Sequence, residues 1–324
     1  MSVATTRAFW IAESGRGEIR EQQLQPPAPN EAQVRTLYSG LSRGTETLVF
    51  EGRVPRSEFQ RMRAPFQEGE FPAPVKYGYI NVGVVELGPE AMLGREVFCL
   101  YPHQSRYNVP VETLQPLPRG VPAARAVLAA NLETAVNALW DAGLQRSARL
   151  SVIGAGALGC LCAWLARTRY GAHVQLIDID ESRANTATRL GVAFATPQTA
   201  MTDVPHVIHT SATAAGLAAA LELAAFEGTI IELSWYGDDA VAVPLGGAFH
   251  SRRLTIRASQ VGHVAAPMRG HATHRSRLQH ALRLLRDPAL DCLIDSECRL
   301  DELPDVLAAL AAGKRSAICH RITY

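Results

Sequence analysis

Residues 150–159 restrict the fold of this chain more than any other segment. They read Leu-Ser-Val-Ile-Gly-Ala-Gly-Ala-Leu-Gly, an apolar strand that leads into a Gly-x-Gly-x-x-Gly turn at the start of a helix. In such a turn the first glycine permits the bend, the second lets the backbone approach a pyrophosphate, and the third allows the helix to pack on the strand. The helix N-terminus offers N–H groups to the phosphates. The expected cofactor-binding residues of this turn are Gly154, Ala155, Gly156, Ala157, Leu158 and Gly159.

An acidic residue stands where a dinucleotide site needs one. A second apolar strand, residues 174–177, ends in Asp178, which lies 19 residues after Gly159. A carboxylate about 20 residues past the turn accepts hydrogen bonds from the adenosine ribose hydroxyls. Because a carboxylate also repels a 2′-phosphate, the sequence favours NAD(H) over NADP(H). The alternative is a βα turn without a ligand, with Asp178 simply at the surface.

Two further residues are candidates for the cofactor site. Arg183 follows Asp178 by five positions, where it either covers the adenosine ribose or lies on an exposed helix face. Ser211 follows a third strand, residues 207–210. Since a doubly wound sheet binds ligands at the carboxyl ends of its strands, Ser211 is expected to face the cofactor. A helix-capping or turn role is the alternative for this serine.

The length of 324 residues and the change of pattern along the chain predict two domains. Residues 1–122 are β-rich, with strands at 33–38, 82–87 and 97–100. Residues 123–287 form the expected nucleotide-binding domain, in which strands alternate with helices and predict an α/β fold with a parallel, doubly wound sheet. Its expected helices cover residues 123–141, 181–190 and 216–226, with another helix starting near 157. Residues 288–324 follow as a strand–helix–strand segment.

Composition excludes several classes of protein. Lys and Arg number 32 against 31 Asp and Glu, so charge gives no case for a nucleic-acid or membrane-surface binder. No apolar run approaches the roughly 18 residues that span a bilayer, and the first residues do not resemble a secretory signal. The six cysteines are scattered, unlike a disulfide framework or a four-cysteine zinc lobe. We therefore expect a cytoplasmic protein that acts on a small molecule, with no nucleic-acid or membrane partner.

Over nearly its whole length the chain resembles the medium-chain dehydrogenase/reductase superfamily. Residues 38–42 are similar to the first active-site strand and loop of that family, and residues 74–85 to its Pro-x-x-x-Gly-His-Glu-x-x-Gly-x-Val segment. Residues 134–139 resemble the helix before the nucleotide fold, and Gly313-Lys314 the late glycine–lysine turn. The resemblance implies a GroES-like β domain, a Rossmann domain and a C-terminal return to the first domain.

The departures from the family pattern concern its metal. Zinc-dependent members carry Cys, His and Glu where this chain has Ser42, Tyr79 and Ile80, and the third ligand position is Ala130. A hydroxyl, a phenol and two aliphatic groups do not provide the thiolate, imidazole or carboxylate donors that Zn²⁺ prefers. Glu133 is out of register by three positions. We therefore expect a zinc-free member of the superfamily with no metal site.

Without a metal, a side-chain acid or base must handle the hydroxyl proton in hydride transfer. The resemblance places Ser42 and Tyr79 near the nicotinamide, and Lys76 is a candidate to lower the pKa of Tyr79. Glu46 is expected to act as a base or to orient Arg43. The alternative is that these are buried, hydrogen-bonded residues of a site that has lost its function. His103 is either a second proton carrier or a structural histidine.

The expected activity is zinc-independent hydride transfer between NAD(H) and an alcohol or ketone. Residues 42–46, Ser-Arg-Gly-Thr-Glu, resemble the bacteriochlorophyllide a dehydrogenase branch of the superfamily. This resemblance favours alcohol oxidation over enone reduction as the expected activity. One alternative is a quinone or enoyl reductase of the same superfamily. Another is a non-catalytic, nucleotide-binding regulatory protein.

Two expectations concern substrate charge and assembly. A set of arginines indicates either an anionic substrate or a solvated basic loop balanced by nearby glutamates. Its members are Arg53, Arg56, Arg61, Arg63, Arg106, Arg252 and Arg253. The resemblance also implies a homodimer paired through the edge of the Rossmann sheet, around residues 241–244 and 254–258.

Overall fold

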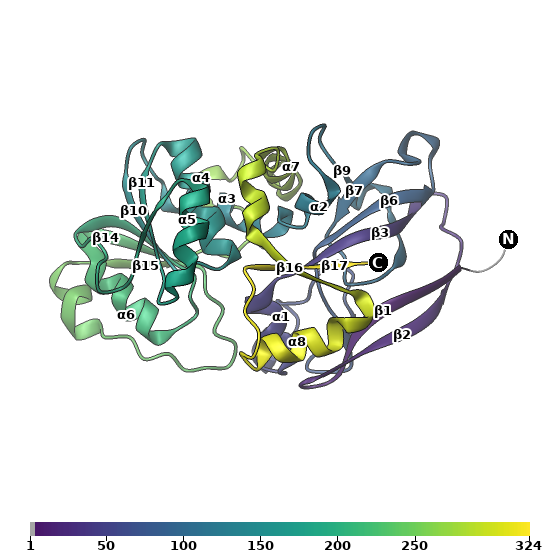
Figure 1. The fold of residues 1–324 in the computed structure, drawn as a ribbon, viewed down its shortest axis with the longest axis horizontal. Coiled ribbons are helices and arrows are strands. Elements are labelled where there is room, and N and C mark those ends of the chain that lie inside the picture. The colour runs from purple at the N-terminus through teal and green to yellow at the C-terminus, as the bar shows by residue number, and fades with distance from the viewer. Residues whose placement is uncertain (1–3) are drawn as a thin grey trace. The chain divides into compact units, whose positions relative to one another are not determined.

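The computed structural model describes residues 4–324 and divides the chain into two compact units (Figure 1). The first unit contains the residues up to Ala130 together with Leu282–Asp287 and Ile294–Tyr324. The second contains Asn131–Ala281 and Pro288–Leu293. None of the described helices combines the length and the apolar character needed to cross a membrane.

The first unit is built on two sheets. A four-stranded sheet has the order β2-β1-β5-β4, and a seven-stranded sheet has the order β16-β17-β3-β6-β7-β9, with β8 paired to β3. The strands are β1 (Ala4–Glu13), β2 (Arg16–Leu24), β3 (Glu31–Leu41), β4 (Glu68–Gly69), β5 (Val75–Lys76), β6 (Asn81–Leu87), β7 (Glu96–Cys99), β8 (Arg106–Pro110), β9 (Gln115–Pro116), β16 (Ile294–Arg299) and β17 (Cys319–Thr323). The helices are α1 (Arg43–Phe50), α2 (Ala123–Ala126) and α8 (Leu303–Ala311).

Residues 294–324 lie in the first unit, whereas residues 288–293, which were also expected to return there, belong to the second unit. Strand β17 pairs antiparallel with β3, so that Ile322 lies opposite Ser39. Figure 1 shows yellow β16 and β17 beside purple β3. The alternating apolar side chains of β3, β6, β7 and β8 form a core on the inner face of this sheet. Since β3 is paired on both sides, its buried side chains are held from several directions.

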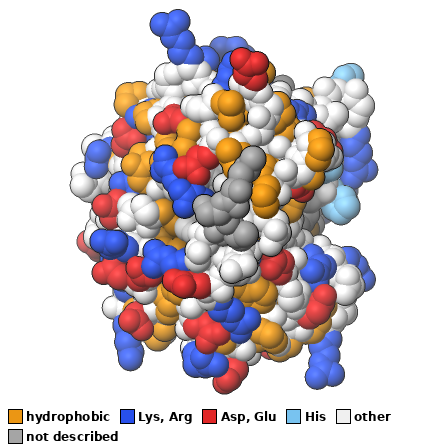
Figure 2. All heavy atoms as spheres, turned by 90° about the vertical axis from the view of Figure 1, so that its right-hand side faces the viewer, with side chains coloured by type: hydrophobic (Ala, Val, Ile, Leu, Met, Phe, Trp, Pro, Cys, Tyr) orange, Lys and Arg blue, Asp and Glu red, His pale blue; other side chains and the backbone are white. Residues whose placement is uncertain are grey.

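The surface of the first unit mixes charges of both signs. On the β1–β2 hairpin, Arg16 forms ion pairs with Glu13 and Glu18, and Arg20 pairs with Glu18. Figure 2 shows basic and acidic side chains interspersed on the face that it presents. That face carries no continuous basic stripe of the kind that tracks a phosphate backbone.

The second unit contains a six-stranded parallel sheet with the order β12-β11-β10-β13-β14-β15. Numbered within the sheet, this order is 3-2-1-4-5-6, the doubly wound arrangement that binds dinucleotides where the order reverses. The strands are β10 (Arg149–Ile153), β11 (His173–Ile177), β12 (Ala193–Ala195), β13 (Val204–His209), β14 (Ala224–Glu232) and β15 (Thr255–Ala258). The helices are α3 (Ala129–Ala142), α4 (Ala157–Tyr170), α5 (Ala184–Leu190), α6 (Ala214–Leu223) and α7 (His274–Leu284).

Several boundaries differ from the sequence expectations. The helix expected over residues 123–141 is two helices, α2 and α3, because the chain bends to bury Val127 and Leu128 completely. Helix α2 packs on β3, β6 and β7, so residues 123–130 belong to the first unit and not, as expected, to the nucleotide-binding domain. The helix expected over 216–226 ends at Leu223, and β14 begins at once. Residues 241–244, expected at the sheet edge, form no strand, whereas β15 is the edge strand.

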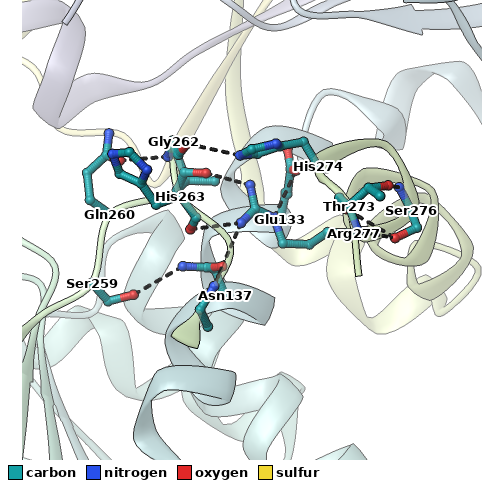
Figure 3. Close-up of polar contacts among 12 residues, drawn as sticks. Glu133, Asn137, Ser259, Gln260, Gly262, His263, Thr273, His274, Ser276 and Arg277 are labelled. Atoms are coloured by element: carbon teal, nitrogen blue, oxygen red, sulfur yellow. Dashed lines mark hydrogen bonds and ion pairs between the residues drawn. The ribbon is translucent and has the colours of Figure 1, made fainter. Parts of the chain in front are cut away.

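A buried arginine ties α7 to α3 inside the second unit (Figure 3). Arg277 is 1% exposed and donates from Nε to Glu133 Oε1 at 3.0 Å and from Nη1 to Asn137 Oδ1 at 2.6 Å. The same guanidinium donates to the carbonyl oxygens of Val261 and His263. Its donors therefore hold the loop between β15 and α7 against α3.

The Arg277 charge is what makes the burial of Glu133 tolerable. Burial raises the pKa of the Glu133 carboxyl, and the nearby Arg277 charge opposes that rise. Asn137 extends the network, since its Oδ1 also accepts the backbone N–H of Ala265 at 2.9 Å. Every member depends on the others, because a buried polar group without its partner is costly.

We expect the Arg277→Met variant to lower the free energy of unfolding by about 3–5 kcal/mol, since removing one partner leaves the other charge buried and unpaired. Urea denaturation followed by the fluorescence of Trp140 and Trp164 measures this. The matched control is Arg275→Met on the exposed face of the same helix, which should cost less than about 1 kcal/mol. Equal losses in the two variants would contradict a structural role for the buried arginine.

Candidate functional site

The glycine turn adopts the geometry that its spacing predicts. Gly154 has a φ of +102°, and a Cβ at this position would lie 2.7 Å from Thr210 Oγ1. A Cβ on Gly159 would lie 1.8 Å from the Gly154 carbonyl oxygen, so the helix packs on the turn only because both residues are glycines. A Cβ on Gly156 would meet nothing within 4 Å. The backbone of this turn is therefore open on the side where a pyrophosphate would approach.

Helix α4 begins at the same turn. Its N-cap is Gly156, and no side chain caps its first turn. Ala157 and Leu158 are half-buried, whereas Ala155 is buried. The N–H groups of the first helical turn thus remain available for an anionic ligand.

Asp178 is joined to the glycine turn by hydrogen bonds. Its Oδ2 accepts the backbone N–H of Ala155 at 2.6 Å, and its Oδ1 accepts the backbone N–H of Asp180 at 2.9 Å. The side chain is half-buried at the end of β11. Because each carboxylate oxygen can accept more than one hydrogen bond, Asp178 can still accept ribose hydroxyls.

The other two cofactor candidates have partners in the protein. Arg183 forms an ion pair with Asp180 at 3.1 Å, and its side chain is only 14% exposed, so it does not lie free on a helix face. Ser211 Oγ lies 2.6 Å from His209 Nε2 and 3.0 Å from Thr213 Oγ1. The N-cap of α6 is Thr213, so Ser211 does not cap that helix.

A histidine–glutamate pair that sequence reasoning missed stands behind Ser211. His209 Nδ1 lies 2.7 Å from Glu232 Oε2, and the Tyr236 hydroxyl donates to the same carboxylate at 3.2 Å. His209 and Glu232 are the last residues of β13 and β14, which end side by side because the strands are parallel. This pair could have been predicted from the sequence, because His209 and Glu232 are polar residues that each end an apolar strand, and the two strands are consecutive.

In the first unit, the three candidate proton-handling residues lie together. Glu46, in the first turn of α1, accepts the backbone N–H of Ser42 on Oε1 at 2.8 Å. The Tyr79 hydroxyl is hydrogen-bonded to the side chains of Ser42 and Thr45. Glu46 is buried, whereas Ser42 and Tyr79 are half-buried. Glu46 is therefore the most buried of the three candidates, and its bond to Ser42 is to the backbone.

The structure corrects the expected effect of Lys76 on Tyr79. The Lys76 ammonium is buried and bonded to Glu68 and to Gln104 Oε1, the latter at 2.6 Å. Burial, together with the charge of Glu46, raises the pKa of Tyr79 to about 12. A phenol in this environment is a hydrogen-bond donor at neutral pH and not a base.

His103 is the partner of Glu46 that the sequence expectation did not assign. Its Nε2 lies 2.8 Å from Glu46 Oε2, and its ring is fully buried. Glu46 is thus bonded to both Ser42 and His103. The two residues are 57 positions apart, so no local motif links them.

The residues at the family's zinc position do not fit a zinc ion. Ile80 is fully buried and Ala130 is 5% exposed, and neither has a donor atom. Glu133, three positions further, is bound to Arg277. Across residues 4–324, no three His, Cys, Asp or Glu side chains are grouped so that they could hold a metal ion. No chemical step is therefore derived through zinc.

Five of the seven arginines noted in the sequence form ion pairs with glutamates. They are Arg53, Arg61, Arg63, Arg106 and Arg253. Arg252 instead donates to the backbone carbonyls of Glu222 and Ala224. These pairings favour the balanced, solvated basic loop over a site for an anionic substrate.

Comparison with known proteins gives one short sequence match. No model of a protein family matches the chain. An uncharacterized zinc-type alcohol dehydrogenase-like protein from Haemophilus influenzae is 37% identical over 83 residues, which are 26% of this chain and 24% of that protein. The match thus spans about a quarter of the relative.

Solved structures match over the full length. L-idonate 5-dehydrogenase from Escherichia coli has a TM-score of 0.81 at 15% identity and covers 100% of this chain and 99% of its own. A protein described as a zinc-binding dehydrogenase from Sinorhizobium meliloti, bound to NADP, has a TM-score of 0.78 at 17% identity, with 99% and 100% covered. The chain therefore has the same fold as these dehydrogenase structures, with a β-rich unit and a unit built on a doubly wound parallel sheet.

Proposed function

We propose that the protein is an NAD(H)-dependent, zinc-independent oxidoreductase that transfers a hydride between the nicotinamide and an alcohol or ketone. The observation that carries the proposal is the glycine turn with Asp178 bonded to it, at the point where the order of the parallel strands reverses. That point is where doubly wound sheets bind dinucleotides.

Different residues of the second unit would bind successive parts of the dinucleotide. The open backbone at Gly156 and the first turn of α4 would hold the pyrophosphate. Asp178 would accept the ribose hydroxyls, and its charge disfavours a 2′-phosphate there. Ser211, supported by His209, offers a hydroxyl at the carboxyl edge of the sheet. Once bound, the nicotinamide supplies or accepts the hydride.

Residues of the first unit would handle the proton. The family resemblance assigns Ser42 and Tyr79 to the substrate side, where zinc stabilises the alkoxide in other members. Here a protonated Tyr79 would donate a hydrogen bond to the substrate oxygen as negative charge develops on it. Glu46, buried and bonded to the backbone N–H of Ser42, supplies a carboxylate to which a proton can be transferred.

We expect Asp178→Asn to raise the Kd for NADH by about tenfold to a hundredfold, since a hydrogen bond to a charged group contributes about 1.5–3 kcal/mol. The Kd for NADPH should change less or should fall. Fluorescence titration of both nucleotides measures this selectivity. Equal losses for NADH and NADPH would indicate a collapsed turn instead of lost ribose recognition.

Glu181→Gln is the matched control, because Glu181 is a neighbouring exposed carboxylate and not the one that pairs with Arg183. It should leave the ratio of the two Kd values unchanged. A wild-type protein that binds NADPH more tightly than NADH would contradict the NAD(H) assignment.

We expect Tyr79→Phe to lower kcat for ketone reduction by about a hundredfold, the usual effect of removing one donor to a developing oxyanion. The active form is the protonated phenol, which is lost only as pH rises through its pKa of about 12. An unperturbed tyrosine ionises near pH 10, so the wild-type rate should not fall below about pH 10 through loss of this proton. Steady-state kinetics across pH measure both effects.

Tyr77→Phe is the control, because Tyr77 packs edge-on against Tyr79 with ring centroids 6.1 Å apart but lies deeper in the core. Its kcat should match that of the wild type. Equal rates for wild type and Tyr79→Phe would remove the proposed donor.

The other candidate activities are separated by a substrate panel and metal analysis of the same preparation. The panel offers secondary alcohols, ketones, enones and quinones with NAD(H). Turnover of enones or quinones alone would identify a double-bond or quinone reductase. Tight NADH binding without any turnover would identify a regulatory protein. Stoichiometric zinc would overturn the zinc-independent mechanism.

A further inference from the structure

A continuous chain of hydrogen bonds runs through the first unit from Glu46. Glu46 Oε2 lies 2.8 Å from His103 Nε2, and His103 Nδ1 lies 2.7 Å from Ser39 Oγ. Ser39 Oγ lies 2.8 Å from the Tyr324 hydroxyl. All four side chains can both take up and release a proton, and each distance is within hydrogen-bonding range.

The two ends of this series of hydrogen bonds, Glu46 and Tyr324, lie in different surroundings. Ser39 and His103 are fully buried, and the Glu46 side chain is only 4% exposed. Tyr324 is 36% exposed and lines a pocket of about 550 Å³ in the first unit. Tyr38, Pro122 and the carboxylate-bearing Glu96 also line that pocket. The chain therefore connects a buried carboxylate to a surface pocket that water can enter.

Donor and acceptor chemistry fixes one direction of donation for all the hydrogen bonds between Tyr324 and Glu46. When Glu46 is ionised it can only accept, so His103 Nε2 carries a proton and donates it to Glu46. His103 Nδ1 must then accept the Ser39 O–H, and Ser39 Oγ in turn accepts the Tyr324 O–H. Every hydrogen points from the pocket toward Glu46, as proton delivery to the buried end requires.

On the neighbouring strand, Arg321 is paired with Glu297, and His320 does not act as a competing cation. His320, on β17, is buried beside this chain of hydrogen bonds, and burial, together with the charges of Arg315 and His103, lowers its pKa to about 4. His320 is therefore neutral near pH 7. The remaining titratable groups that face Glu46 are the phenols of Tyr77 and Tyr79 and the thiol of Cys319. His103 is thus the group through which a proton reaches Glu46.

We propose that His103, Ser39 and Tyr324 form a proton relay between the buried carboxylate of Glu46 and the pocket at Tyr324. In ketone reduction, a hydronium ion in the pocket gives a proton to the Tyr324 oxygen and leaves as water, the Tyr324 proton passes to Ser39, and the Ser39 proton passes to His103 Nδ1. The Nε2 proton moves to Glu46, which then holds the proton that the substrate oxygen takes up. Alcohol oxidation reverses each transfer. The catalytic use of the relay rests on the proposed function.

The relay is tested by proton exchange between Glu46 and water: after a rapid drop in pH, infrared spectroscopy of the carboxyl C=O band, assigned with Glu46→Gln, follows the rate at which Glu46 gains a proton. Each transfer along the relay delivers one proton from the pocket to Glu46. Tyr324→Phe and Ser39→Ala should therefore slow the exchange by about tenfold or more, as expected for removal of a proton-transfer group. A purely structural role predicts the opposite, because a loosened core exchanges faster.

Tyr38→Phe is the matched control, because it removes a hydroxyl from the same pocket without touching the chain. It should leave the exchange rate unchanged. Exchange that is unchanged or faster in Tyr324→Phe would overturn the relay, and so would equal slowing in Tyr38→Phe.

The exchange measurement needs no substrate, so it stays decisive even if no alcohol or ketone is turned over and the proposed function fails. With a turned-over ketone from the panel, Tyr324→Phe should lower kcat, leave KM unchanged and increase the solvent deuterium isotope effect. Slowed exchange with an unchanged kcat would confine the relay to the resting protein and overturn its part in catalysis.

Discussion

The parallel pairing of β10 with β11 and β13 is the constraint on which the candidate cofactor site depends. Parallel strands end at the same edge of a sheet, so the glycine turn, Asp178 and Ser211 meet there although they are far apart in sequence. The hydrogen bond from Ala155 to Asp178 then joins two of these strand ends directly. The sheet thus supplies both the position and the rigidity of the site.

In the first unit the main feature is a buried carboxylate, Glu46, that is held by hydrogen bonds and not by a Lys or Arg side chain in the contacts described above. Glu46 is satisfied by the backbone N–H of Ser42, which directly follows β3, and by the ring of His103, which lies between β7 and β8. A buried charge without such bonds would cost far more than a single hydrogen bond contributes. The same bonds that stabilise Glu46 extend through Ser39 to Tyr324, so stability and proton transfer use one network.

Sequence reasoning succeeded where the signal was local. The glycine spacing, the strand before it and the carboxylate after the next strand predicted the turn and the Asp178 position correctly. It was wrong about Lys76, because the partners of an ammonium group depend on which strands lie beside it, here those that bring Glu68 and Gln104. It was also wrong about one long helix at 123–141, because the burial of Val127 and Leu128 outweighed helix propensity.

The sequence by itself determined the fold class, the glycine turn and the lack of metal donors at the positions that resemble the family's zinc site, since residue type and short-range spacing decide these features. Only the tertiary structure brought Glu46, His103, Ser39 and Tyr324 together, across separations of 57, 64 and 285 residues. It also set His209 against Glu232. Hydrogen bonds of this kind act over less than 3 Å, and the pairing of strands distant in sequence decides which side chains come that close.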